Sequence, residues 1–317
     1  MRWGILGPGK ISRAFLTGLA GSATEHAVAV GSRDLDRAQA VATEFGVGRA
    51  YGSYEELLGD DTVEAVYIGT PNAVHGPWSI AAARAGKHVL CEKPLGVSRA
   101  EAERMFTVAR EEGVRLMEAF MYRFHPRTRK LAELVAAGDI GAPTLVRSSF
   151  GFPLTDRGNV RLSADLAGGA LMDVGCYPVN AARMLAGPVA AVSAAARRQD
   201  VDVTLAGLLD HTGGALSVIS CSLAGGRHNV LQVIGTDGVI DVPVAFTPPR
   251  DQVSTLVVSR GTDTEELTFE PVDQYTAEAE GFAACVAAGH DADLPQMPLT
   301  ESLDNATTIE NLLAAAV

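Results

Sequence analysis

The sequence predicts an α/β protein whose first part is a doubly wound parallel sheet and whose second part is an α+β domain with a large, mostly antiparallel open sheet. Before residue 120, apolar strands alternate with amphipathic helices five times, a pattern typical of parallel sheets covered by helices. Between residues 190 and 269, strand follows strand across short glycine and aspartate turns without a helix, which favours antiparallel pairing. We therefore expect two domains, 1–122 and 123–317, with a C-terminal helix able to pack back on the first.

The composition restricts the partners of this chain. It has 317 residues and a formal net charge of −12 and is 47% hydrophobic, which fits a folded protein with a substantial core. The negative charge argues against nucleic acid and anionic membrane surfaces, because both select basic patches. The chain shows no leader and no apolar run near the ~20 residues of a membrane span, so we expect a cytoplasmic protein without membrane contact.

The cysteine and histidine positions indicate neither a metal site nor a disulfide framework. The cysteines have no C-x-x-C spacing, and the histidines have none of the spacings typical of zinc ligands. We expect no metal, and we interpret the cysteines as small buried residues in a reducing compartment. They are Cys91, Cys176, Cys221 and Cys285.

A glycine-rich turn follows the first predicted strand, residues 3–6. Residues 7–12 read G-x-G-x-x-S, and helical spacing begins at once. In a dinucleotide-binding fingerprint the first glycine makes the turn, and the second lets the backbone approach the pyrophosphate at the helix N-terminus. Ser12 replaces the usual third glycine or alanine and is still small enough for close packing. The expected cofactor contacts in this turn are Gly7, Gly9, Lys10 and Ile11.

The end of the second predicted strand bears on the choice of cofactor. An acidic residue there would bind the ribose 2′-hydroxyl of NAD. The sequence has Ser32 and Arg33 instead, which can donate to a 2′-phosphate or stack on adenine, with Asp34 as the expected cap of the next helix. We therefore predict NADP, with NAD as the alternative if Ser32 and Arg33 are simply turn residues.

Two further strand ends carry polar residues that are expected at the same edge of the sheet. After the strand at 63–68, the loop contains Thr70, Pro71, Asn72 and His75. After the strand at 88–91 come Glu92 and Lys93, and a proline ends the extended run. The carboxyl ends of parallel strands face the ligand crevice, so a lysine there is placed to meet a substrate oxygen. From these residues alone, a solvated Glu-Lys pair is an equal alternative.

Together these segments resemble the glucose-fructose oxidoreductase, inositol dehydrogenase and rhizopine-catabolism (Gfo/Idh/MocA) family. The resemblance extends over almost the whole chain, because 117–126 is similar to the family's domain junction and 168–177 to its substrate-domain motif. Many members have histidine at the last motif position and aspartate three residues later, where this chain has Tyr177 and Asn180. With tyrosine at this last motif position, the chain resembles the branch of the family that contains dimeric dihydrodiol dehydrogenase and NADP-dependent xylose dehydrogenase.

The resemblance implies an NADP-dependent oxidoreductase acting on a sugar, a ketosugar or a cyclic polyol. Tyr177 is expected to exchange the proton, Lys93 to polarise the substrate oxygen and lower the tyrosine pKa from ~10, and Asp173 to orient the substrate. Glu92 is expected on the cofactor side. Weaker candidates at the rim are Arg123 and His75 on the cofactor side and Asn180 on the substrate side.

Alternatives remain for both activity and assembly. A trans-dihydrodiol or aldose dehydrogenase is the second enzymatic possibility, and a non-catalytic regulator that senses NADP is the possibility from another class. Several strands of the second domain are apolar on both faces, as in residues 216–221 and 230–234, so one face needs a cover beyond this domain's helices. We expect a second subunit there, in a homodimer or homotetramer, as the resemblance also implies.

Overall fold

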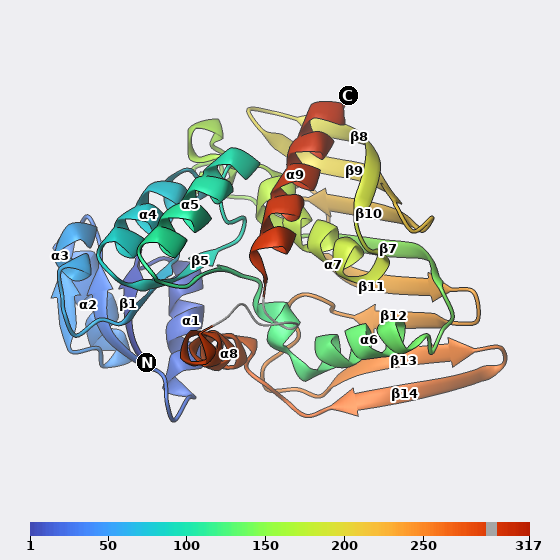
Figure 1. Cartoon of the computed structure of the whole chain (residues 1–317). Coiled ribbons are helices and arrows are strands. Elements are labelled where there is room, and N and C mark those ends of the chain that lie inside the picture. The colour runs from blue at the N-terminus through green and yellow to red at the C-terminus, as the bar shows by residue number, and fades with distance from the viewer. Residues whose placement is uncertain (290–296) are drawn as a thin grey trace. The chain divides into compact units, whose positions relative to one another are not determined.

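The computed structural model describes residues 1–289 and 297–317 of the chain (Figure 1). The chain divides into two compact units. Unit 1 comprises Met1–Phe124 and Asp273–Leu303, and unit 2 comprises His125–Val272 and Asp304–Val317. This division differs from the single boundary expected after residue 122, because the chain returns to unit 1 at Asp273. No helix in the described ranges is both long and apolar enough to cross a bilayer.

Unit 1 is built on a six-stranded parallel sheet with the order β3-β2-β1-β4-β5-β6. The order reverses between β1 and β4, so the turns that follow these two neighbouring strands lie side by side at the carboxyl edge. This reversal is where open α/β sheets bind ligands. The strands are β1 (Arg2–Leu6), β2 (His26–Gly31), β3 (Arg49–Tyr51), β4 (Ala65–Ile68), β5 (His88–Glu92) and β6 (Leu116–Ala119).

The helices of unit 1 begin where the sequence carries capping signals. Asp34 accepts hydrogen bonds from two amides of the first turn of α2, as predicted, and Ser53 accepts one from Glu56 at the start of α3. The helices are α1 (Lys10–Ala20), α2 (Leu35–Phe45), α3 (Tyr54–Leu58), α4 (His75–Arg84), α5 (Arg99–Glu111) and α8 (Gln274–Ala288).

Helix α8 belongs to unit 1 because it packs on α1. A Cβ atom at Gly18 would lie 2.6 Å from Cβ of Tyr275, so the absence of a side chain at Gly18 permits the close approach. Thr276 Oγ1 also donates to the Gly18 carbonyl over 2.7 Å. Phe282 of α8 completes an aromatic cluster with Trp3, whose ring meets that of Phe15 edge to face. These contacts explain why residues after 272 return to the first unit.

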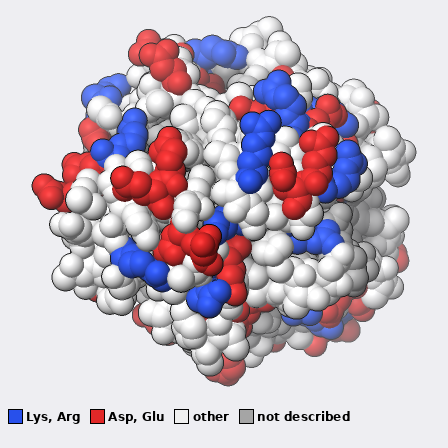
Figure 2. Space-filling model, turned by 60° about the vertical axis from the view of Figure 1, so that its left-hand side comes forward, with Lys and Arg blue, Asp and Glu red and all other residues white. Residues whose placement is uncertain are grey.

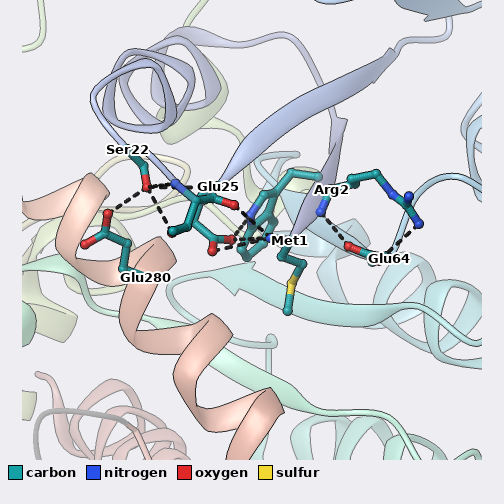
Figure 3. A network of polar contacts seen from close by, with 8 residues as sticks. Met1, Arg2, Ser22, Glu25, Glu64 and Glu280 are labelled. Carbon is teal, nitrogen blue, oxygen red and sulfur yellow. Dashed lines mark hydrogen bonds and ion pairs between the residues drawn. The ribbon is translucent and has the colours of Figure 1, made fainter.

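Polar contacts tie α8 to the start of β1 (Figure 3). Glu25 is 3% exposed and accepts the indole N–H of Trp3 over 2.8 Å. Ser22 accepts the backbone N–H of Glu25 and donates to Glu280 of α8 over 2.6 Å. The carboxylate of Glu25 thus satisfies the only polar atom of a fully buried tryptophan.

Unit 2 contains an eight-stranded sheet with the order β14-β13-β12-β11-β7-β10-β9-β8. Its neighbouring strands pair antiparallel except for β7 and β10, which are parallel, so the predicted mostly antiparallel sheet is confirmed. The strands are β7 (Pro143–Gly151), β8 (Val189–Arg198), β9 (Asp202–His211), β10 (Leu216–Ser222), β11 (His228–Gly235), β12 (Val239–Pro243), β13 (Ser254–Arg260) and β14 (Asp263–Phe269).

Helices cover one face of this sheet and leave apolar side chains on the other. Helix α7 (Cys176–Ala186) packs on β7 and β10, and α6 (Pro126–Ala137) packs on β13. On β9 and β10, Leu208 and Val218 are paired in register and are 39% and 47% exposed. Leu216 and Val230 are 41% and 52% exposed. Alternation along each strand therefore presents apolar side chains on both faces of the central strands.

The last helix, α9 (Leu299–Ala315), begins in unit 1 and ends in unit 2. The pattern Thr-Glu-Ser-Leu suggests Thr300 as its cap, and this prediction is wrong. The backbone N–H of Ser302 donates to the Pro298 carbonyl, so the first turn already contains Thr300. In unit 2 the end of α9 lies along β8, where Ala316 bridges to Ala194.

A buried arginine holds the end of β12 in unit 2. Arg127 is 1% exposed, and its guanidinium donates to the carbonyls of Pro243, Val244 and Ala245 over 2.8 to 2.9 Å. Burial lowers its pKa to about 10, which leaves it charged at neutral pH. The three carbonyls belong to a left-handed residue, Val244 at φ 48°, and its two neighbours, and one planar cation donates to all of them.

Candidate active site

The glycine-rich turn after β1 has the geometry of a phosphate-binding loop. Gly7 adopts φ 88°, and Gly9 caps α1 with an extended conformation. Ser12 is fully buried and donates to the Gly7 carbonyl over 2.6 Å, which fixes the turn against the helix. The first turn of α1 contains no acidic residue, so its N-terminal amides present positive partial charge to an anion. Lys10 is exposed beside them, and Ile11 is half-buried.

The turn after β4 lies next to this loop. A Cβ atom at Gly7 would meet Thr70 Cγ2 at 3.1 Å, and one at Gly9 would meet only the Gly69 carbonyl, at 3.7 Å. Oγ1 of Thr70 is buried without a hydrogen-bonding partner among the described residues. A buried hydroxyl of this kind calls for a partner. The orphaned hydroxyl, the open glycine turn and the free helix N-terminus all fit a bound dinucleotide.

His75 joins the turn after β4 to the exit of β5. Pro71 and Asn72 lead into a short 3-10 turn, Asn72–Val74, and α4 then begins at His75. The imidazole is 1% exposed, with Nδ1 2.9 Å from the Pro94 carbonyl and Nε2 2.9 Å from the Thr70 carbonyl. Burial lowers the pKa of His75, so the neutral ring bridges the two segments.

The end of β2 presents the residues predicted to select the cofactor. Ser32 is buried, and its hydroxyl accepts the backbone N–H of Asp34 over 3.2 Å. Arg33 is exposed at the same carboxyl edge. The carboxylate of Asp34 faces the amides of α2 and is committed to the cap. The only side chain at this strand end that is both charged and uncommitted to a cap is therefore that of Arg33.

Lys93 lies at the exit of β5, directly after the buried carboxyl group of Glu92. Glu92 is 5% exposed, accepts the Tyr67 hydroxyl and accepts the backbone N–H of Lys93 over 3.2 Å. Lys93 itself is half-buried. Behind Glu92, Glu278 of α8 is fully buried, and both of its carboxyl oxygens are without a hydrogen-bonding partner in the described residues. Burial and the neighbouring Glu92 raise the pKa of Glu278 well above its usual range, which favours its neutral form.

On the other side of the strand exit lies Glu118 of β6, to which the sequence analysis assigned no role. Its Oε1 accepts the backbone N–H of Leu95 over 2.9 Å, and the group is 2% exposed. Arg123 is 1% exposed and forms an ion pair with Glu301 over 2.8 Å. Arg123 is therefore buried within unit 1 as a structural cation. Glu118 lies in the segment 117–126 that resembles the family's domain junction, but its contact with Leu95, 23 residues away, has no signal in the sequence.

In unit 2, Tyr177 stands in the first turn of α7. Its ring packs at 5.4 Å from those of Phe150 and Phe246, and the residue is 4% exposed. The helix is preceded by a π-helical turn, Leu171–Gly175, a feature that often marks functional positions. Asp202 accepts the Leu171 amide over 2.7 Å and so anchors the start of this turn. Asn180 is 1% exposed and lies on the same face of α7 as Tyr177.

Asp173 is held by an arginine from the polar loop before the motif. Arg161 Nε donates to Asp173 Oδ2 over 2.6 Å, and the loop forms short 3-10 turns at Val160–Leu162 and Ala164–Leu166. The sequence predicts Asp173 at the substrate but does not predict its ion pair with Arg161. Unit 1 thus brings together the glycine turn, Thr70, His75 and Lys93, and unit 2 brings together Asp173 and Tyr177. The pairing of Lys93 with Tyr177 joins residues of different units and stays a prediction.

The fold and these two sets of residues define a dinucleotide-binding protein with a second, α+β unit. Residues 1–120 match the family model described as the Gfo/Idh/MocA oxidoreductase family with an NAD-binding Rossmann fold, and residues 128–241 match the Gfo/Idh/MocA C-terminal domain. The chain belongs to the Gfo/Idh/MocA oxidoreductase family.

Relatives and solved structures match over nearly the whole chain. D-xylose 1-dehydrogenase (NADP(+)) 2 of Haloferax volcanii is 40% identical over 320 residues, covering 100% of this chain and 97% of that protein. Trans-1,2-dihydrobenzene-1,2-diol dehydrogenase of Mus musculus is 39% identical over 78% of this chain and 76% of its own length. The crystal structure of a 3-ketoreductase from Actinomadura kijaniata, in complex with NADP and TDP-benzene, superposes with a TM-score of 0.92 at 34% identity, covering 100% of this chain and 98% of that one.

Proposed function

We propose that this protein is an NADP-dependent oxidoreductase that transfers a hydride between nicotinamide and a carbonyl or hydroxyl carbon of a sugar, ketosugar or cyclic polyol. The observation that carries the proposal is the half-buried Lys93 on the same sheet edge as the glycine turn and the unpartnered Thr70 hydroxyl. Hydride transfer to or from a dinucleotide held by that turn needs a cation such as Lys93 near the substrate oxygen. Relatives that act on xylose, dihydrodiols and a keto group support the substrate class.

The cofactor contacts follow from the geometry of unit 1. Gly7, Gly9 and the first amides of α1 would hold the pyrophosphate, with Lys10 and Ile11 beside them. Ser32 and Arg33 would hold the 2′-phosphate of NADP, and Thr70, Pro71 and Asn72 would line the nicotinamide side. His75, Glu92 and Arg123 are buried, so they support these segments from within.

Each remaining polar group has one task in the reaction. NADP, when bound, would supply the hydride acceptor for oxidation of a CH–OH carbon, a reaction that also releases a proton. Tyr177 accepts that proton, and the Lys93 ammonium donates a hydrogen bond to the substrate oxygen. Asp173, oriented by Arg161, accepts a hydrogen bond from a neighbouring hydroxyl of the substrate, and Asn180 supports this side from α7. In reduction the same proton returns from Tyr177.

A panel of substrates tests the proposal. Purified protein is expected to oxidise NADPH with at least one aldose, ketosugar or dicarbonyl, or to reduce NADP⁺ with an aldose or a trans-dihydrodiol. NADH serves as the matched control and is expected to react at least ~10-fold less efficiently, because it lacks the phosphate that Arg33 binds. Tight NADPH binding with no turnover anywhere in the panel would overturn the enzymatic proposal and favour a regulator that senses NADP.

The assembly proposed here is a homodimer, or a homotetramer built from it, in the cytoplasm. The exposed Leu208, Val218 and Val230 of the unit 2 sheet support it, since apolar side chains grouped on one face mark an interface. On the face of the molecule drawn in Figure 2, acidic and basic side chains are interspersed, as on an ordinary solvated surface.

Sedimentation velocity tests the assembly. The wild-type protein is expected to sediment as a dimer or tetramer, and Val218→Asp as a monomer, because a carboxylate would be buried without a partner in the interface. Thr264→Asp, which adds the same charge at an exposed position of β14, is the control and is expected to sediment like the wild type. A monomeric wild-type protein would refute the interface.

A further inference from the structure

Three successive residues at the exit of β5 are each held by a side chain from a different element. The Lys93 amide donates to Glu92, the Pro94 carbonyl meets His75, and the Leu95 amide donates to Glu118. All three holding side chains are at most 5% exposed. The backbone that carries Lys93 is therefore fixed by buried polar groups, and Glu118 is the one for which no task has been assigned.

Glu118 also lies where its charge reaches Lys93. In the register of β5 and β6 it stands opposite Cys91, so its side chain lies on the sheet face opposite to that of Glu92. Lys93 and Arg123 both interact electrostatically with its carboxyl group. Arg123 is in addition paired with Glu301.

The remaining neighbours of Glu118 are neutral. Its Oε2 and the hydroxyl of Ser302 of α9 are both buried, and neither has a hydrogen bond of good geometry among the described residues. Cys91 stays a thiol, because burial raises its pKa well above the usual range. The charged groups around Glu118 are thus Lys93 from the β5 exit, Arg123 from the turn after β6, and Glu301 from α9 through its pair with Arg123.

We propose that Glu118 is a positioning residue that fixes the strand exit at Leu95 and, as a carboxylate, holds the Lys93 ammonium charged and oriented toward the substrate. The proposal rests on the function proposed above, because it assigns Lys93 to the reacting oxygen. Burial raises the pKa of Glu118 to about 7, against the opposing effects of the Leu95 amide, Ser302, Arg123 and Lys93. The folded-state pKa is raised, so the carboxylate, and with it full activity, is present above pH 7 and is lost as the pH falls below it.

The pH dependence of turnover gives the first test. In the wild type, kcat/KM is expected to rise about tenfold between pH 6 and pH 8, through an ionisation near 7. Glu118→Gln keeps an acceptor for the Leu95 amide but not the charge, so this rise is expected to disappear while NADPH affinity is unchanged. Glu118→Asp is expected to restore part of it. The control is Glu101→Gln, in which another buried carboxyl holds a backbone amide, that of Val97, over 2.8 Å.

A direct titration tests the role of Glu118 independently of the proposed oxidoreductase function. With ¹³C-labelled glutamate, one carboxyl resonance is expected to titrate near pH 7, to be absent in Glu118→Gln and to shift to higher pH in Lys93→Met, which removes a neighbouring positive charge. A titration unaffected by Lys93→Met would overturn the coupling, whether or not the protein turns over any substrate. If Glu118→Gln does not fold, the Lys93→Met comparison still decides. An inactive protein with an intact titration shift would refute only the proposed function.

Discussion

Tyr177→Phe is expected to lower turnover at least ~10²-fold while leaving NADPH affinity unchanged, because it removes the hydroxyl that exchanges the proton. The ring keeps its contacts with Phe150 and Phe246, each at 5.4 Å, so the variant should fold like the wild type. Steady-state kinetics with the best substrate of the panel and fluorescence titration with NADPH measure the two quantities. Tyr51→Phe, which loses a hydroxyl bonded to Asp60 over 3.0 Å, is the control and should retain near-normal turnover.

Lys93→Met is expected to lower turnover by as much as Tyr177→Phe does. The double variant shows whether the two residues act together. If Lys93 and Tyr177 serve one proton transfer, the double variant should be little worse than either single variant, since residues of one catalytic unit are strongly non-additive. Multiplicative losses would assign the two residues to separate steps. Turnover within a few-fold of wild type in either single variant would remove that residue from the mechanism.

Arg127→Met is expected to destabilise the protein by about 3–5 kcal/mol, because it leaves three carbonyls at a buried or partly buried site without their donor. The free energy of unfolding of Arg127→Lys should lie between those of the wild type and Arg127→Met, since one ammonium cannot match the fork of a guanidinium. Urea unfolding followed by circular dichroism measures the free energy. The control is Arg129→Met, two residues along α6 and exposed, for which a change within ~0.5 kcal/mol is expected. An equal effect of both substitutions would show that the carbonyls find other partners.

Local signals made much of unit 1 predictable. The glycine turn, the cap at Asp34 and the strand ends at Thr70 and Lys93 each depend on a few adjacent residues, and the parallel sheet follows from their alternation. The cap at Thr300 was wrong because the sequence pattern is the same whether the helix is capped at that residue or two residues earlier, and the hydrogen bond of Ser302 to the Pro298 carbonyl decides. A local pattern cannot discriminate between such registers.

Contacts between distant residues were not predictable. The parallel pairing of β7 with β10 joins segments about 70 residues apart, and no turn signal specifies it. The placement of α8 depends on the missing side chain at Gly18, far from it in the sequence. The same holds within the site, where the hydrogen bond between Glu118 and Leu95 and the ion pair of Arg161 with Asp173 join residues 23 and 12 apart in the sequence.

The return of residues 273–303 to unit 1 has a consequence for how the chain is made. A ribosome delivers residues 1–124 first, but the Phe282 ring and the Thr276 hydroxyl that complete this unit emerge only after the entire second sheet. Until then the nascent first unit exposes the apolar side of α1 to chaperones or to other nascent chains. The second unit likewise awaits its share of α9. The first unit is therefore incomplete until residue 303 has emerged, and the second until its part of α9 has followed.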